Sequence, residues 1–234
     1  MRIATFSLAF VVAIFSTSAA VAAPVFGTFS GVINATDLAT FSGDILGTPA
    51  SEFHEGDLVS GTFSYNPATM TPAALPPGFA FAIFNGPIAF DFKIGSHDFS
   101  FSGQGPNSDV SMLDPAIAGV VQYFAAARQY NGNFSTGFDI DVPGPGPLYS
   151  DAHDLTSVQF QNMPAIFEFA FSETDPFTSG TTSLGYFSIA VHASVPVATT
   201  PIPASALLFL TGIAGLGLTV TRKTKVASTK SHAA

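Results

Sequence analysis

Apolar and polar side chains alternate over several short stretches in the middle of the chain. Phe167, Phe169 and Phe171 are separated by Glu168 and Ala170, so the three rings would lie on one face of a strand. Clusters of Gly, Pro, Asn, Asp and Ser bound these stretches, and such clusters typically mark the turns between strands. The pattern predicts strands over residues 25–33, 58–65, 88–94, 98–102, 133–142, 157–162, 165–172 and 183–193.

Repeated pairs of Phe indicate how these strands would pack. Phe90 with Phe92, and Phe99 with Phe101, show the same period of two. Two strand faces rich in Phe would stack against each other and form the core of a sandwich. We therefore expect residues 23–194 to form an all-β body, an antiparallel β-sandwich that is jelly-roll-like.

The segments between these strands are less regular. Residues 114–130 combine helix-favouring Ala with β-branched side chains, and the pattern favours a strand, with a helical turn as the alternative. Loops are expected over residues 66–78, 103–114 and 143–154. Within the last of these, Pro143, Pro145 and Pro147 are expected to end any strand, because proline has no N–H to donate to a ladder.

The first residues have the pattern of a secretory signal peptide. Arg2 precedes an apolar run over residues 6–15, and small residues follow it. The run is too short for a comfortable transmembrane helix. Ala20 and Ala22 fit the small-x-small rule for signal cleavage, so we expect removal of residues 1–22.

The C-terminal residues have the pattern of a membrane span. Residues 204–221 carry no charge, and as a helix they would extend about 27 Å, close to the thickness of a bilayer core. Arg222, Lys223 and Lys225 follow at once, and basic residues beside a span stay on the cytoplasmic side. We expect a Pro-rich linker over residues 195–203, a single transmembrane helix over 204–221 and a basic cytoplasmic tail over 222–234. The alternative is a core helix that closes the domain.

The linker ends in Pro201-Ile202-Pro203-Ala204. A Pro-x-Pro motif, an apolar span rich in Leu and Gly, and a terminal basic cluster together resemble the PEP-CTERM protein-sorting tail, in its VPLPA-CTERM-like variant. The chain departs from the family pattern in two ways, because no Glu separates the two prolines and the tail beyond Lys225 is long and polar. Residues 55–65 and 183–193 are also similar to segments in the bodies of such proteins.

The resemblance implies a cellular route. In that family a membrane-embedded, transpeptidase-like protease, an exosortase, is taken to recognise the tail. The resemblance implies a Gram-negative bacterium, export through the inner membrane, transient anchoring, removal of the tail, and delivery to the cell surface or the medium. Such proteins accompany exopolysaccharide production and biofilm. Residues 201–204 would then be the sorting motif, and the chain would be a substrate of the processing enzyme.

Charge changes the picture of possible partners. The sequence has 16 acidic and 7 basic residues, a net charge of −9, and no Cys. Only Lys93 and Arg128 among the basic residues lie in the body, which would therefore carry a net charge of −14. Such a charge excludes nucleic acid as a partner, since phosphates would repel it, and disfavours acidic polysaccharide without a bridging cation. The lack of Cys excludes disulfides and thiolate chemistry.

Motifs for catalysis are lacking in the sequence. No Gly-x-Ser-x-Gly elbow occurs, and His54-Glu55-Gly56-Asp57 lacks the second His of a zinc-binding helix. We therefore expect no enzyme, no catalytic residues and no required cofactor. Calcium is the sharpest ligand hypothesis, because carboxylates and loop carbonyls are its usual ligands. The candidate ligands are Asp139, Asp141, Asp151 and Asp154.

These observations lead to one principal interpretation and its alternatives. We expect an exported, non-catalytic surface or matrix protein with a structural or adhesive role in exopolysaccharide. A calcium-dependent carbohydrate-binding module and an undetected hydrolase are the alternatives for the body. A protein anchored permanently through its span is the alternative topology.

Overall fold

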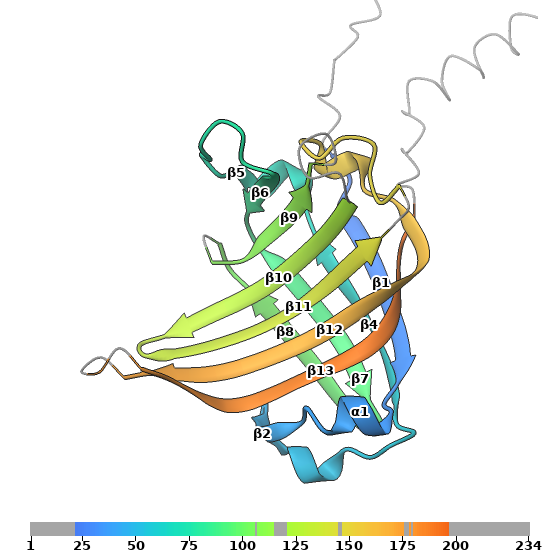
Figure 1. Ribbon diagram of the computed structural model, residues 1–234, viewed down its shortest axis with the longest axis vertical. Helices are drawn as coiled ribbons and strands as arrows, with labels where there is room; N and C mark the ends of the chain where they lie inside the picture. Colours follow the sequence, from blue (N-terminus) through green and yellow to red (C-terminus); the bar gives the residue numbers. More distant parts are fainter. Residues whose placement is uncertain are drawn as a thin grey trace, which may run out of the picture. The chain divides into compact units, whose positions relative to one another are not determined.

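The computed structural model describes residues 22–105, 107–114, 121–144, 147–175, 178 and 180–196. These residues form a mostly antiparallel β structure in which the sheet curls into a half-barrel (Figure 1). The strands are β1 (Val25–Val32), β2 (Ser42–Ile45), β3 (Thr48–Pro49), β4 (Leu58–Tyr65), β5 (Thr71–Pro72), β6 (Phe81–Asn85), β7 (Ile88–Ile94), β8 (His97–Gly103), β9 (Asp109–Leu113), β10 (Val121–Asn131), β11 (Phe134–Gly144), β12 (Phe160–Thr174) and β13 (Thr181–Val195). The short helical elements are α1 (Ala35–Leu38), η1 (Ala50–Glu52), η2 (Pro67–Thr69) and η3 (Leu155–Ser157).

One hydrogen-bonded sheet contains the main strands. Its order is β5-β6-β9-β10-β11-β12-β13-β1-β4-β7-β8, and β2 branches from β13 and pairs with β3. Figure 1 shows β9 to β13 as one layer in front of a second layer formed by β1, β4, β7 and β8. The all-β, antiparallel prediction is confirmed. The expected sandwich of two separate sheets is replaced by one curled sheet, because β1 pairs with β13 and joins the two layers.

Phe side chains fill the space between the two layers. Phe92 of β7 and Phe101 of β8 lie 4.9 and 5.0 Å from Phe138 of β11, measured between ring centroids. These strands are not neighbours in the ladder, so the contacts show that the sheet has folded over onto itself. Phe167 of β12 is fully buried at the centre of the cluster. It contacts Phe29, Phe90, Phe92, Phe138 and Phe187.

Glycines on β1 and β4 make room for two of these rings. Gly27 lies opposite Phe63, and Gly61 lies opposite Phe29. A Cβ built at Gly27 would collide with the Phe63 ring, and one at Gly61 would collide with Phe29 and with Phe92. Each ring therefore lies across the bare backbone of the neighbouring strand, which lets the layers pack at close distance.

Side chains near α1 bind the part of β13 that lies between its pairings with β1 and β2. β1 pairs with residues 191–194 of β13, and β2 pairs with residues 185–186. Between them, the Ser188 N–H donates to Thr40 Oγ1 at 2.7 Å and the Ala190 N–H donates to Asp37 Oδ1 at 3.2 Å. Asn34 caps the helix and holds Asp37 in place. Side chains thus satisfy backbone groups that have no strand beside them.

The structure corrects several sequence-based predictions. Residues 103–114 were expected to form a loop but include β9, and the strand β6 was not expected. β11 continues through Pro143, because β12 no longer pairs with β11 beyond Asp141 and a sheet tolerates proline at such an edge. The two strands expected over residues 157–162 and 165–172 belong largely to the single strand β12, which has a bulge between Phe160 and Met163. The strand favoured within residues 114–130 is confirmed as β10.

The packing of Gly61 yields a stability prediction. We expect Gly61→Ala to lower the free energy of unfolding by about 1–3 kcal/mol, because the new methyl group overpacks the core against Phe29 and Phe92. The measurement is urea unfolding of the purified chain, followed by circular dichroism. Gly137→Ala is the matched control, because its Cβ would meet the flexible Arg128 side chain at 3.3 Å. Equal effects of the two substitutions would contradict this account of the core.

Candidate functional site

Most of the sequence-predicted sorting residues lie outside the described residues. These are Ala20 of the signal cleavage site, Pro201, Ile202, Pro203 and Ala204 of the sorting motif, and Arg222, Lys223 and Lys225 of the basic stop. Ala22 is described, and it precedes the first residue of β1 by three positions. Among the described residues, no helix is long and apolar enough to cross a membrane.

Asp139 and Asp141 lie on the outer face of β11. Between and beside them, Phe138, Ile140 and Val142 point into the core and are fully buried, so the alternation of the strand turns both carboxylates outward. Asp139 pairs with Glu168 of β12 on one side and with Ala126 of β10 on the other. Ala126 in turn pairs with Asp109 of β9. The four carboxylates of Asp109, Asp139, Asp141 and Glu168 form what we term the acidic row.

The members of the acidic row differ in their partners. Arg128 Nη1 donates to Asp109 Oδ1 at 2.6 Å. Gln122 Nε2 lies 2.9 and 3.0 Å from the two oxygens of Asp141. Glu168 Oε1 accepts from Ser188 Oγ at 3.1 Å and from Tyr186 at 3.3 Å. By contrast, Asp139 Oδ1 is buried and has no hydrogen-bond partner among the described residues.

Burial and the different partners change the pKa values of two carboxyl groups of the acidic row. Burial and, secondarily, the Glu168 carboxylate raise the pKa of Asp139 to about 7, and the Arg128 guanidinium only partly opposes them. Burial also raises the pKa of Asp141, where the hydrogen bond from Gln122 acts in the opposite direction. At neutral pH, Asp139 is therefore close to half protonated.

Asp151 and Asp154 lie in another part of the fold and serve local turns. Asp151 Oδ1 accepts the N–H of His153 at 2.8 Å. Asp154 caps η3, where its Oδ1 accepts from the N–H of Thr156 at 2.9 Å and from its hydroxyl at 2.6 Å. The structure does not join this pair to the acidic row. The described part of the chain contains no group of three or more His, Asp or Glu side chains placed to hold a metal ion.

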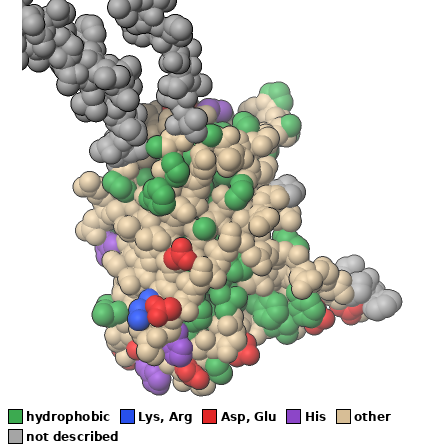
Figure 2. Space-filling model, turned by 180° about the vertical axis from the view of Figure 1, so that it is seen from behind, with side chains coloured by type: hydrophobic (Ala, Val, Ile, Leu, Met, Phe, Trp, Pro, Cys, Tyr) green, Lys and Arg blue, Asp and Glu red, His purple; other side chains and the backbone are tan. Residues whose placement is uncertain are grey.

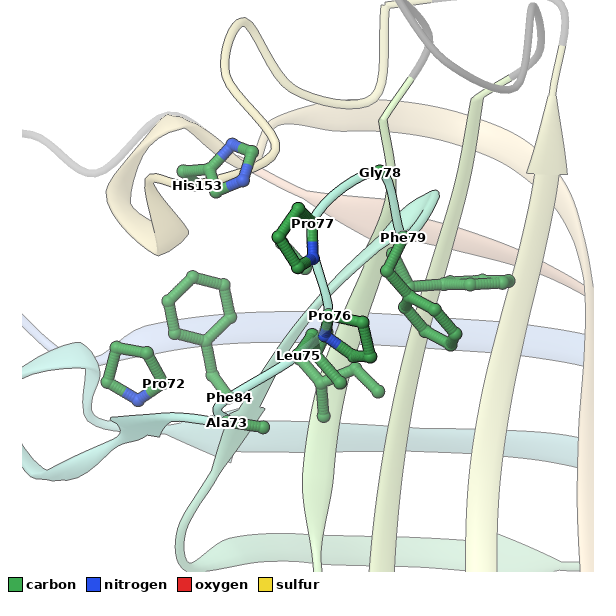
Figure 3. Close-up of a pocket in the computed structure, with 12 residues that line it drawn as sticks. Pro72, Ala73, Leu75, Pro76, Pro77, Gly78, Phe79, Phe84 and His153 are labelled. Atoms are coloured by element: carbon green, nitrogen blue, oxygen red, sulfur yellow. The ribbon is translucent and has the colours of Figure 1, made fainter.

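A shallow pocket of about 420 Å³ lies beside β5 and β6, and the sequence analysis did not identify it. We term residues 72–81 the pocket loop, since they supply most of the lining. Figure 3 shows Pro72 and Phe84 on one side, Pro76 and Pro77 on the other, and His153 reaching in from a separate segment.

The pocket loop is held by a defined turn. The Phe79 N–H donates to the Pro76 carbonyl at 3.2 Å, and Gly78 has a positive φ of 82°. Proline followed by glycine with positive φ is the signature of a type II turn. At its base, the Ala73 N–H donates to the Ile83 carbonyl at 2.8 Å. The Pro-Pro-Gly sequence could have indicated this turn, but not the approach of His153.

Two buried tyrosines place polar hydroxyl groups inside the aromatic core. Among the described residues, the hydroxyls of Tyr65 and Tyr123 make no well-formed hydrogen bond, and they interact with each other. Burial raises the pKa of both hydroxyls, so both stay protonated at physiological pH. These hydroxyls lie within the packed aromatic core, where Tyr123 contacts Phe63 and Phe160.

Comparisons with protein-family models, with curated proteins and with solved structures find no match for this chain.

The pKa of Asp139 yields a prediction of pH dependence. Its folded-state pKa of about 7 lies above the ordinary value of 3.8, so the folded state binds the proton more tightly than the unfolded state. Stability is then lost as the pH rises from 4 through 7. We expect Asp139→Asn to remove this loss and to raise the free energy of unfolding at pH 8 by about 1–2 kcal/mol.

Urea unfolding at pH 4, 6 and 8 checks this prediction. Asp98→Asn is the matched control, because Asp98 is exposed and its carboxylate lies 3.4 Å from Lys93 Nζ, which is also exposed. We expect the control to change stability by less than about 0.5 kcal/mol. A benefit of Asp139→Asn that is the same at pH 4 and pH 8 would contradict the assignment.

Proposed function

We propose that this chain is an exported, non-catalytic protein of the cell envelope or extracellular matrix, with a structural or adhesive role in exopolysaccharide. The body is the part displayed, and the C-terminal residues sort it. An exosortase-type protease is the processing partner, and the membrane holds the chain until processing takes place.

The order of the C-terminal sequence carries this proposal. β13 ends at Val195. Pro201 follows six residues later, then the uncharged residues 204–221 and the basic cluster from Arg222. A complete sheet followed at once by a Pro-x-Pro motif, a span and a basic stop fits a domain that is separable from its sorting tail.

The body has properties that suit display outside the cell. Its core is a single cluster of aromatic and aliphatic side chains, and the acidic row lies on the outer face of the front layer. The excess of negative charge favours solubility and discourages self-association. It also makes a neutral polymer, or an acidic one bridged by cations, the better ligand. These features support a scaffold more than a catalyst.

The intact mass of the protein recovered from membranes and medium of the native host tests the proposal. We expect a form that lacks residues 1–22 and everything beyond about residues 200–204. A form that keeps residues 204–234 and is found only in the inner membrane would overturn sorting, and would leave a single-span envelope protein.

The sorting motif yields a prediction by mutation. We expect the double substitution Pro201→Ala and Pro203→Ala to abolish release and to leave the unprocessed chain in the membrane, because the processing enzyme would no longer recognise the extended Pro-x-Pro segment. The measurement is an immunoblot of membrane and medium fractions. Pro196→Ala is the control, since it removes a nearby proline that precedes the motif. Release of the double variant at the normal level would contradict the motif assignment.

A further inference from the structure

The pocket loop exposes apolar side chains at its tip. Phe79 is 47% exposed and Phe81 is 38% exposed, and their ring centroids lie 6.1 Å apart. Pro76 and Pro77 are exposed beside them. The type II turn fixes the backbone of this tip, so the two rings are presented to solvent without a large loss of conformational entropy on binding. Exposed aromatic side chains grouped in this way typically mark an interaction surface.

The pocket loop lies at the end of the body where β13 finishes. Val195 of β13 pairs with Phe160 of β12. The neighbouring Gln159 N–H donates to the Leu148 carbonyl at 2.8 Å. Tyr149 then donates to the Leu113 carbonyl, and Leu113 pairs with Phe81. A continuous series of contacts thus connects the last strand with the pocket loop, and Figure 1 shows β5 and β6 toward the same end of the body as the end of β13.

The pocket loop itself carries no charged side chain. The sequence has no Asp, Glu, Lys or Arg between Asp57 and Asp91. Figure 2 shows that the charged side chains of the back face gather toward the opposite end of the body. The ionisable groups near the pocket loop are His153 in the pocket lining, its neighbours Asp151 and Asp154, and Asp114, whose N–H donates to the Ala80 carbonyl at 2.7 Å. These acidic neighbours would be repelled by anionic headgroups but tolerated by zwitterionic ones.

We propose that the pocket loop docks on the surface of a lipid bilayer, with Phe79 and Phe81 at the boundary between headgroups and acyl chains. This inference rests on the proposed function, in which residues 204–221 hold the chain in the membrane. Residues 196–203, which lie between the end of β13 and the proposed span, reach at most about 28 Å, so they keep this end of the body close to the bilayer. Aromatic side chains on an uncharged, preformed loop then gain by leaving water at the interface.

The docked orientation points the long hairpins away from the membrane. β10 begins at Val121, near the pocket end, and ends at Asn131, about 33 Å farther along the strand. Phe134 follows at the start of β11 and is 39% exposed, nearly the same as Phe81. The two Phe residues therefore match in exposure and differ in their distance from the proposed contact.

Single tryptophans test the proposal, because the natural chain contains no Trp. Phe81→Trp and Phe134→Trp are made in the full chain and reconstituted in vesicles of phosphatidylcholine, with and without bromine on the acyl chains. Brominated lipid should quench Trp emission several-fold more in Phe81→Trp than in Phe134→Trp. Partial replacement by phosphatidylglycerol should weaken the quenching of Phe81→Trp. Phe79→Trp serves as a second reporter if Phe81→Trp impairs folding.

The outcomes separate this inference from the proposed function. If the chain floats with the vesicles and neither Trp is quenched by brominated lipid, the anchor stands and docking is overturned. If Phe81→Trp is shielded from aqueous acrylamide but not quenched by lipid, a protein segment covers the pocket loop, and docking is again overturned. If the full chain does not float with the vesicles, both the anchor and the docking are wrong.

Discussion

The contact between Phe side chains of two halves of one sheet is the interaction on which the structure depends. Phe138 and Phe167 belong to neighbouring strands of the front layer, and each contacts Phe92 of the back layer. Because strand side chains alternate, placing these rings inward sends the residues between them outward. The positions of Asp139 and Glu168 on the outer face follow directly from the positions of Phe138 and Phe167 in the core.

Local patterns predicted much of this sheet, and long-range pairing could not be predicted from them. The period of two identified β7, β8 and the centre of β12, because each of these strands has one buried and one exposed face. It gave no indication that β1 pairs with β13, since no local signal records a contact between the first and last strands. β9 was missed because Ser111 on its outer face is buried together with Met112 on its inner face, so the alternation is hidden.

The candidate surfaces show the same division between local and distant information. The strand predicted over residues 133–142 contains Asp139 and Asp141, and their spacing of two puts both on one face of β11. Glu168 and Asp109 join them only through the register of three ladders, which the sequence does not encode in any short motif. Likewise, the Pro-Pro-Gly segment indicates a turn, whereas the approach of His153 to the pocket depends on how the loop before η3 packs.

The distribution of charge gives the body a polarity along its length. The raised pKa of Asp139 reflects burial first and then the neighbouring carboxylates of the front layer, which the Arg128 guanidinium only partly opposes. The stretch from Leu58 to Phe90 adds no charge at all, and it includes the pocket loop near the end of β13. Negative charge repels the anionic surface of a membrane, while uncharged aromatic groups favour the interface. The electrostatic energy of such a body near a bilayer is therefore lowest when its acidic faces point away from the membrane and the uncharged pocket loop points toward it.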